Sequence, residues 1–259
     1  MKSPFNYALI TGATSGIGES LSYLLADKGI NLILTGRNEE QLQHLSQALS
    51  PKVHVITIAA DLLNPEERQK VIEALKKYTP ELVINNAGFG LYGPAVNHST
   101  AAQLDILSIN SLVPLELSLE ASKALIASKK KGLIVNVASA AAFLVYPTLA
   151  VYSSAKTFLV QASKALDLEL APEGIRMLVS CPGMVFTHFS ERASKGKVSS
   201  PNGFKMTPEY AANQIWQQIQ TKQQCRIFDW KYRWAIHLSR LLPYRWTAKL
   251  LQQQIADRF

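Results

Sequence analysis

The sequence is poor in cysteine and in charged residues. Its 259 residues include two cysteines, Cys181 and Cys225, which are too few for a disulfide scaffold and fit a reducing compartment. Charged residues make up 18%, while nine Tyr, nine Phe and four Trp exclude a disordered chain. We therefore expect a folded cytoplasmic protein, and the length suits one large α/β domain or two small ones.

Targeting segments, long hydrophobic runs and metal-ligand patterns are also missing. The first apolar run is too short for a signal peptide, so we expect no removable segment there. Residues 132–152 are long enough to cross a bilayer, but Asn136, Ser139 and Pro147 favour a strand followed by a loop. The five His are scattered, so we expect no metal site. Nothing resembles a nucleic-acid-binding module.

Short apolar runs alternate with longer amphipathic segments along most of the chain. The predicted strands, each rich in Val, Ile and Leu as strands buried on both faces are, are Tyr7–Thr11, Asn31–Thr35, Val53–Ile58, Leu82–Asn86, Leu133–Ala138 and Ile175–Cys181. The predicted helices are Ile17–Lys28, Glu39–Leu49, Pro65–Tyr78, Ala101–Ile126 and Ala150–Leu170. This alternation predicts a doubly wound parallel β-sheet with helices on both faces, in one domain over residues 1–225. Lys129, Lys130 and Lys131 are interpreted as a solvated helix end.

A glycine-rich turn follows the first predicted strand. Residues 11–18 read TGATSGIG, a pattern that permits a tight turn and brings a pyrophosphate to the amino end of a helix. The candidate contacts in this turn are Gly12, Thr14, Ser15, Gly16, Ile17 and Gly18. Arg37 ends the second strand and suits a 2′-phosphate, which favours NADP, with NAD still possible. A solvated Arg at a helix start explains Arg37 equally well when it is taken alone.

Two further strand ends carry candidate cofactor contacts. Asp61 and Leu62 follow the third strand, where Asp61 could accept a hydrogen bond from an adenine amino group or simply cap the next helix. Asn86, Ala87 and Gly88 follow the fourth strand and place small residues where a flat ring must approach, although such turns also occur in ordinary loops.

Four residues are candidates for the chemistry. Tyr152 and Lys156 are four residues apart and project from one side of a predicted helix. A neighbouring ammonium would lower the Tyr pKa from its usual value near 10. Ser139 ends the fifth strand, where its hydroxyl could donate to a substrate carbonyl or satisfy a local turn. Asn110 is unusual inside a predicted helix and marks either a functional kink or a bend caused by Pro114.

Taken together, these motifs resemble the classical short-chain dehydrogenase/reductase family in their order and spacing over roughly residues 5–225. The resemblance implies a single-domain Rossmann fold and hydride exchange between a nicotinamide and a carbonyl or alcohol. It implies that Tyr152 donates the proton, that Lys156 binds the nicotinamide ribose and that Ser139 polarises the carbonyl. It also implies that Asn110 holds a water molecule. A Pro-Gly segment would cover the nicotinamide through Pro182, Gly183, Val185 and Thr187.

The residues after 225 depart from the family pattern. Cys225–Phe228 is a possible seventh strand, and residues 226–259 hold three of the four Trp and five of the eight net positive charges. This extension is predicted to form amphipathic helices. They either cover the substrate cleft or a second subunit, or lie on a membrane surface through residues 230–256. A homo-dimer or homo-tetramer is expected, although the extension makes the family's common tetramer an unsafe inference.

The segments expected to surround the substrate are apolar. They are Phe89–Asn97, Ala140–Thr148 and Phe186–Gly203, and their large apolar residues are Phe89, Leu91, Tyr92, Phe143, Leu144, Val145, Tyr146, Phe186 and Phe189. An apolar lining predicts a fatty-acyl, steroid-like or other lipidic carbonyl substrate. The sequence therefore favours an NADP(H)-dependent oxidoreductase. A cofactor-binding sensor and a membrane-associated interaction protein, both with little turnover, are the alternatives.

Overall fold

The chain is built around one parallel sheet, as the alternation of runs predicts. The computed structural model describes residues 4–185, 193, 206–239 and 241–255. The strands run in the order β3-β2-β1-β4-β5-β6-β7, and every neighbouring pair is parallel. They are β1 (Tyr7–Thr11), β2 (Asn31–Gly36), β3 (Val55–Ala59), β4 (Leu82–Asn85), β5 (Gly132–Val137), β6 (Ile175–Cys181) and β7 (Cys225–Ile227). The order reverses between β1 and β4, which is where open α/β sheets bind ligands.

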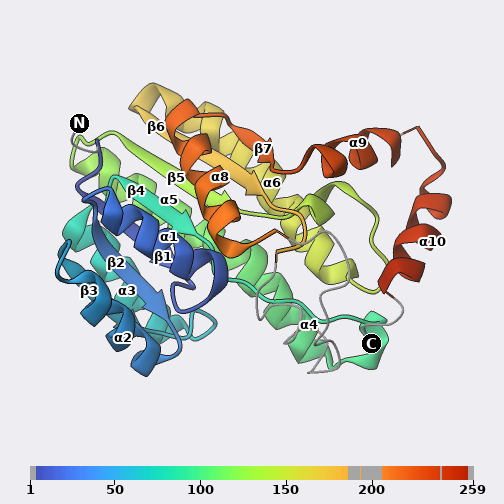
Figure 1. The fold of residues 1–259 in the computed structure, drawn as a ribbon, viewed down its shortest axis with the longest axis horizontal. Helices are drawn as coiled ribbons and strands as arrows, with labels where there is room; N and C mark the ends of the chain where they lie inside the picture. Colours follow the sequence, from blue (N-terminus) through green and yellow to red (C-terminus); the bar gives the residue numbers. More distant parts are fainter. Residues whose placement is uncertain (1–3, 186–192, 194–205, 240, 256–259) are drawn as a thin grey trace.

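Helices cover both faces of the sheet (Figure 1). One face packs against α1 (Gly16–Asp27), α2 (Glu39–Leu49) and α8 (Pro208–Thr221). The other packs against α3 (Pro65–Tyr78), α5 (Val113–Ala127) and the end of α6 (Ala150–Leu170). The remaining elements are α4 (Thr100–Leu107), α9 (Trp230–Ser239), α10 (Tyr244–Ile255) and the short turns η1 (Ala95–Asn97), η2 (Ser108–Leu112), η3 (Ala140–Phe143) and η4 (Ala171–Glu173). The predicted Rossmann fold with a helical extension is confirmed.

Two details of the prediction were wrong. Residues 101–126 do not form one α-helix, because the π-helical turn η2 separates α4 from α5. The strand β3 is not buried on both faces, and Thr57 and Ala59 are exposed. The described residues supply no further strand beyond β3, so this edge is covered less than the centre of the sheet.

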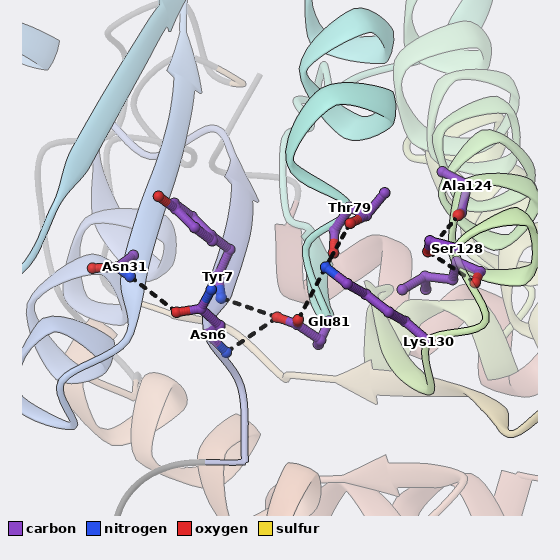
Figure 2. Close-up of polar contacts among 9 residues, drawn as sticks. Asn6, Tyr7, Asn31, Thr79, Glu81, Ala124, Ser128 and Lys130 are labelled. Carbon is purple, nitrogen blue, oxygen red and sulfur yellow. Dashed lines mark hydrogen bonds and ion pairs between the residues drawn. The ribbon is translucent and has the colours of Figure 1, made fainter.

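A charged residue joins the amino ends of β1 and β4, which lie at the opposite end of the strands from the glycine turn. Glu81 accepts hydrogen bonds from the backbone N–H groups of Asn6 and Tyr7, each at 3.1 Å, as Figure 2 shows. Burial raises the pKa of Glu81, but these bonds and the charge of Lys130 outweigh it, so the pKa is lowered overall. Lys130 lies 3.5 Å from Glu81 and donates to Thr79 Oγ1 at 2.6 Å. The side chain of Lys130, in the predicted solvated helix end, is 40% exposed and in addition binds Thr79 and Glu81.

Buried polar contacts fix α6 on the sheet. Asn136 of β5 donates to Ser163 of α6 at 2.8 Å. Asp167 of α6 accepts from the Met177 N–H at 2.7 Å and from Arg176 at 2.8 and 2.9 Å. Because buried polar groups are costly to leave unpaired, these bonds set the position of α6 along β5 and β6. The start of α6 carries Tyr152 and Lys156.

None of the helices in the described part of the chain is long and apolar enough to cross a membrane. Residues 132–152 instead form β5, η3 and the first residues of α6, in agreement with the predicted strand and loop.

Candidate active site

The glycine-rich turn brings α1 against two strand ends. Gly12 and Gly16 have positive φ angles of 65° and 57°, a conformation that glycine adopts without strain. Gly18 lies deeper, where a Cβ atom would collide with the carbonyl oxygen of Gly12 and lie 2.6 Å from Asn86 Nδ2. Ser15 precedes α1 without a side-chain capping bond, so the amino end of α1 is open to an anion.

The end of β4 is tied to the glycine turn. Asn86 Nδ2 donates to the carbonyl oxygens of Thr11 and Gly12 at 3.0 and 3.2 Å. The hydroxyl of Thr11 accepts from the N–H groups of Asn86 and Ala87, both at 3.0 Å. The Asn86–Gly88 turn is therefore not a free surface loop, because its amides hold the two strand ends together.

One cavity of about 890 Å³ connects the predicted cofactor and chemical ends. The predicted site residues that line it are Gly12, Thr14, Ser15, Gly16, Ile17, Arg37, Asp61, Leu62, Asn86, Ala87, Gly88, Asn110, Ser139, Tyr152, Lys156, Pro182, Gly183 and Val185. Gly18 lies behind this lining, where it allows the turn to approach the strand. Thr187 lies outside the described residues. The cavity is thus bounded by the same strand ends that the motifs follow.

Arg37 and Asp61 lie at the far end of the cavity from Tyr152. The guanidinium of Arg37 is exposed, and no ion pair to it is found within the described residues. Asp61 Oδ1 accepts from the Leu63 N–H at 3.0 Å, and the Asp61 N–H donates to Glu67 at 2.6 Å. Asp61 therefore stabilises its own turn as well as lining the cavity. The interpretation of Asp61 as a helix cap was wrong, because Asn64 caps α3.

Ser139, Tyr152 and Lys156, the candidates for the chemistry, lie together at one end of the cavity. Ser139 accepts from the Ala141 N–H at 3.2 Å and shares a hydrogen bond with Tyr152. Lys156 is buried, donates to the Val137 carbonyl oxygen at 2.8 Å and lies 5.8 Å from the centre of the Tyr152 ring. Ser139 thus satisfies a local turn and also contacts the Tyr hydroxyl.

The pKa of Tyr152 is raised, so the expectation that it would be lowered was wrong. Burial raises the pKa of Tyr152 to about 12, and the hydrogen bond from Ser139 only partly opposes it. Burial also lowers the pKa of Lys156 to about 8. Desolvation therefore sets the direction of both shifts, and Tyr152 keeps its proton at neutral pH.

Asn110 lies in the π-helical turn η2 and is completely buried. Its Nδ2 donates to the carbonyl oxygens of Phe89 and Ile106 at 2.7 and 2.8 Å. Its Oδ1 has no partner among the described residues and faces Gly88, where a Cβ atom would lie 2.5 Å from Oδ1 and 3.6 Å from Lys156 Nζ. The irregular turn therefore aims an amide oxygen toward the same point as the ammonium of Lys156.

Apolar side chains surround the Tyr152 end of the cavity. The predicted Phe89, Tyr92, Leu144 and Tyr146 line it. Phe143 instead packs beside β6 and α6, and Val145 is exposed. Leu91 does not line the cavity, and Phe186 and Phe189 lie outside the described residues.

Residues of the C-terminal extension also line this cavity, although none of them is a predicted site residue. They are Asp229, Lys231, Tyr232, Ala235 and Leu251. The ring of Tyr232 lies directly against Gly183, where a side chain would collide with it, and its hydroxyl accepts from the Met184 N–H at 3.2 Å. The spacing of Tyr232 and Ile236 was the available signal for an inward face, but the neighbouring Trp residues dominated the pattern.

Comparisons with known proteins agree with this geometry. Residues 6–198 match the family model described as short chain dehydrogenase. A very-long-chain 3-oxoacyl-CoA reductase of Pyrenophora tritici-repentis is 36% identical over 210 residues, which cover 76% of this chain and 60% of that protein. Sulfoacetaldehyde reductase 2 of Chromohalobacter salexigens is 35% identical over 185 residues, covering 70% of this chain and 73% of that protein.

A solved structure has the same fold over nearly the whole chain. It is a short-chain dehydrogenase from Sphingobium yanoikuyae in complex with NADPH, with a TM-score of 0.79 and 25% identity, covering 91% of this chain and 93% of the other. The chain belongs to the short-chain dehydrogenase family. It spans 60% of the length of two very-long-chain 3-oxoacyl-CoA reductases that it matches.

The buried ammonium leads to a stability prediction for the cofactor-free protein. The unfolded chain holds the Lys156 proton up to about pH 10.5, whereas the folded protein releases it near pH 8. The free energy of unfolding should therefore rise between these pH values. The variant Lys156→Met should lack this rise and be more stable at pH 7 by roughly 2 kcal/mol.

Urea unfolding at several pH values between 7 and 10 measures this effect. The exposed Lys70 offers a control, because Lys70→Met should leave the pH dependence as in the wild type. A Lys156→Met variant that is less stable than the wild type at pH 7 would contradict the prediction.

Proposed function

We propose that the protein is an NADPH-dependent reductase of an apolar carbonyl compound, with Tyr152 as the proton donor. The observation that carries this proposal is the shared hydrogen bond of Tyr152 and Ser139 at the apolar end of a cavity that begins at the glycine turn. Two hydroxyls at one point suit a carbonyl oxygen, which accepts two hydrogen bonds.

Reduction requires that Tyr152 carries its proton. A phenol whose pKa is raised to about 12 by burial holds its proton at neutral pH and can donate it to an oxygen that gains negative charge. Ser139 would orient that oxygen. Lys156, buried beside the ring, would stabilise the phenolate left after the transfer, because an ammonium favours the charged form of Tyr.

The residues along the cavity fit a nicotinamide dinucleotide. The uncapped amino end of α1 suits a pyrophosphate, and Asp61 and Leu62 lie where an adenine would be held. Gly88 leaves space beside Lys156 Nζ, which suits hydrogen bonding from Lys156 to a ribose. When bound, the nicotinamide supplies the hydride for the carbonyl carbon.

The preference for NADP rests on Arg37. Its exposed guanidinium lines the cavity, and no carboxylate precedes Glu39 in the segment after β2. A guanidinium fork binds a 2′-phosphate well, whereas a carboxylate would repel it.

Apolar side chains support a lipidic substrate. Tyr92, Leu149 and Tyr146 pack together beside Tyr152, and Leu251 of α10 closes the cavity from the extension. The two relatives named above act, by their names, on a very-long-chain acyl thioester and on a small sulfonate. The apolar lining favours the first kind of compound.

The central test follows NADPH oxidation with long-chain 3-oxoacyl thioesters, bulky ketones and sulfoacetaldehyde. Turnover should be highest with the apolar carbonyls. In Tyr152→Phe the rate with the best substrate should fall by about 10²- to 10⁴-fold, while the Kd for NADPH stays within about threefold.

Tyr210→Phe is the matched control, because Tyr210 is exposed on α8 and its loss should not affect the rate. Turnover of sulfoacetaldehyde alone would refute the lipidic substrate. NADPH binding without turnover of any compound would favour the cofactor-binding sensor instead.

Charge reversal at Arg37 tests the choice of cofactor. In Arg37→Asp the Kd for NADPH should rise by about 30-fold or more, because a bidentate phosphate contact becomes a repulsion. The Kd for NADH should change by less than about threefold. Equal weakening of both cofactors, measured by fluorescence titration, would mean that Arg37 has only a structural role.

Tyr232 should hold the segment that covers the nicotinamide. Tyr232→Ala removes the ring that packs on Gly183 and the acceptor of the Met184 N–H, so the Kd for NADPH should rise by about tenfold. Tyr232→Phe keeps the ring and should lose only about twofold. Equal effects of the two variants would show that the packing of the ring is unimportant.

A further inference from the structure

The helices α9 and α10 each have two apolar faces. Tyr232 and Ile236 of α9 and Ala248 and Leu251 of α10 face the protein, where they are buried or half-buried. The opposite side of α9 carries Trp230, Trp234 and Leu238, spaced four residues apart, and that of α10 carries Trp246 and Leu250 with the same spacing. We call these five side chains the outer face.

The outer face is exposed to an unusual degree for such large apolar residues. Trp234 and Trp246 are 69% and 67% exposed, and Trp230 is 59% exposed. Exposed apolar patches of this kind mark interaction sites rather than ordinary surface. Figure 1 shows α9 and α10 at one end of the molecule, beyond β7 and opposite β3.

The charge around the outer face has one sign. Residues 230–255 contain five basic residues and no acidic one. Lys231, Arg233, Arg245 and Lys249 are exposed beside the apolar residues. In α9 the 100° step per residue places Lys231 and Arg233 on opposite flanks of the Trp230–Trp234–Leu238 row.

This charge selects among the surfaces that could cover the outer face. A second copy of the chain would bring two equally basic faces together, and like charges oppose such an interface. An anionic bilayer attracts the basic residues, and Trp side chains insert at the boundary between headgroups and acyl chains. From this complementarity we propose that the outer face of α9 and α10 docks the protein on an anionic lipid surface.

Docking would also orient the active site. The inward side of the same two helices lines the cavity through Tyr232 and Leu251, so the outer face would hold this wall of the cavity against the bilayer. An apolar substrate dissolved in the membrane would then reach the cavity without crossing water. The membrane binding itself does not rest on the proposed reductase function, because it requires neither Tyr152 nor a substrate.

The test measures co-sedimentation of the full-length protein with vesicles. Phosphatidylcholine vesicles containing 30% phosphatidylglycerol (about the anionic content that attracts basic segments) are compared with pure phosphatidylcholine vesicles. The wild type should bind the anionic vesicles at least about tenfold more tightly, and the binding should weaken between 0.1 and 0.5 M NaCl, roughly the range over which salt screens surface charges.

Two double variants separate the charges from the apolar side chains. Arg233→Glu/Lys249→Glu should weaken binding by about 25-fold or more, because each basic residue at an anionic surface contributes about a fivefold factor. Trp234→Ser/Trp246→Ser should weaken it by on the order of tenfold. Lys28→Glu/Lys70→Glu makes the same charge change at exposed residues of the α1 and α3 region and should bind nearly as the wild type does.

A further measurement covers the case in which a variant misfolds. Tryptophan fluorescence of the wild type should shift to the blue on adding anionic vesicles and be quenched by brominated acyl chains. An absence of both changes would overturn the proposal. Binding by Arg233→Glu/Lys249→Glu and by Trp234→Ser/Trp246→Ser that equals the binding of the wild type would also overturn it. So would a wild-type oligomer in sedimentation velocity that dissociates in Trp234→Ser/Trp246→Ser without any vesicle binding, because a second copy would then cover the outer face.

Discussion

The close contact between the glycine turn and the end of β4 is the constraint on which the site depends. Gly18 has no room for a side chain beside the Gly12 carbonyl, and Asn86 bonds to the same carbonyl from the neighbouring strand. This contact places the amino end of α1 at the point where the strand order reverses. The cavity begins there because the helices that follow β1 and β4 cover opposite faces of the sheet and leave a crevice between them.

The chemical end depends on desolvation. Lys156 and Asn110 are buried and Tyr152 is half-buried, and the loss of hydration sets the direction of both pKa shifts. In our proposal the protonated phenol is the proton donor, and it lies beside an amine whose pKa is lowered to about 8. Burial of the Lys156 ammonium lowers the free energy of unfolding. Such a loss of stability is typical of functional sites.

The C-terminal extension adds residues to the wall of the cavity. Tyr232 brings α9 onto the Gly183 segment, so residues 49 positions apart in sequence form one wall of the cavity. The two interpretations of the extension, as a cover for the cleft and as a membrane-facing segment, concern opposite sides of the same helices. The contacts support the first directly, whereas the second is our proposal.

Local patterns in the sequence determined most of the fold and the identities of the candidate residues. The limits of α2, α3 and α6 and the motifs on the cavity follow from periodicity and from short motifs, which involve few neighbouring residues. The tertiary structure decided the π-helical turn at Asn110, the contact of Lys130 with Thr79 and Glu81, the raised pKa of Tyr152 and the role of Tyr232 in the cavity. Each of these depends on burial or on contacts between distant segments, and neither quantity can be read from the spacing of residues along the chain.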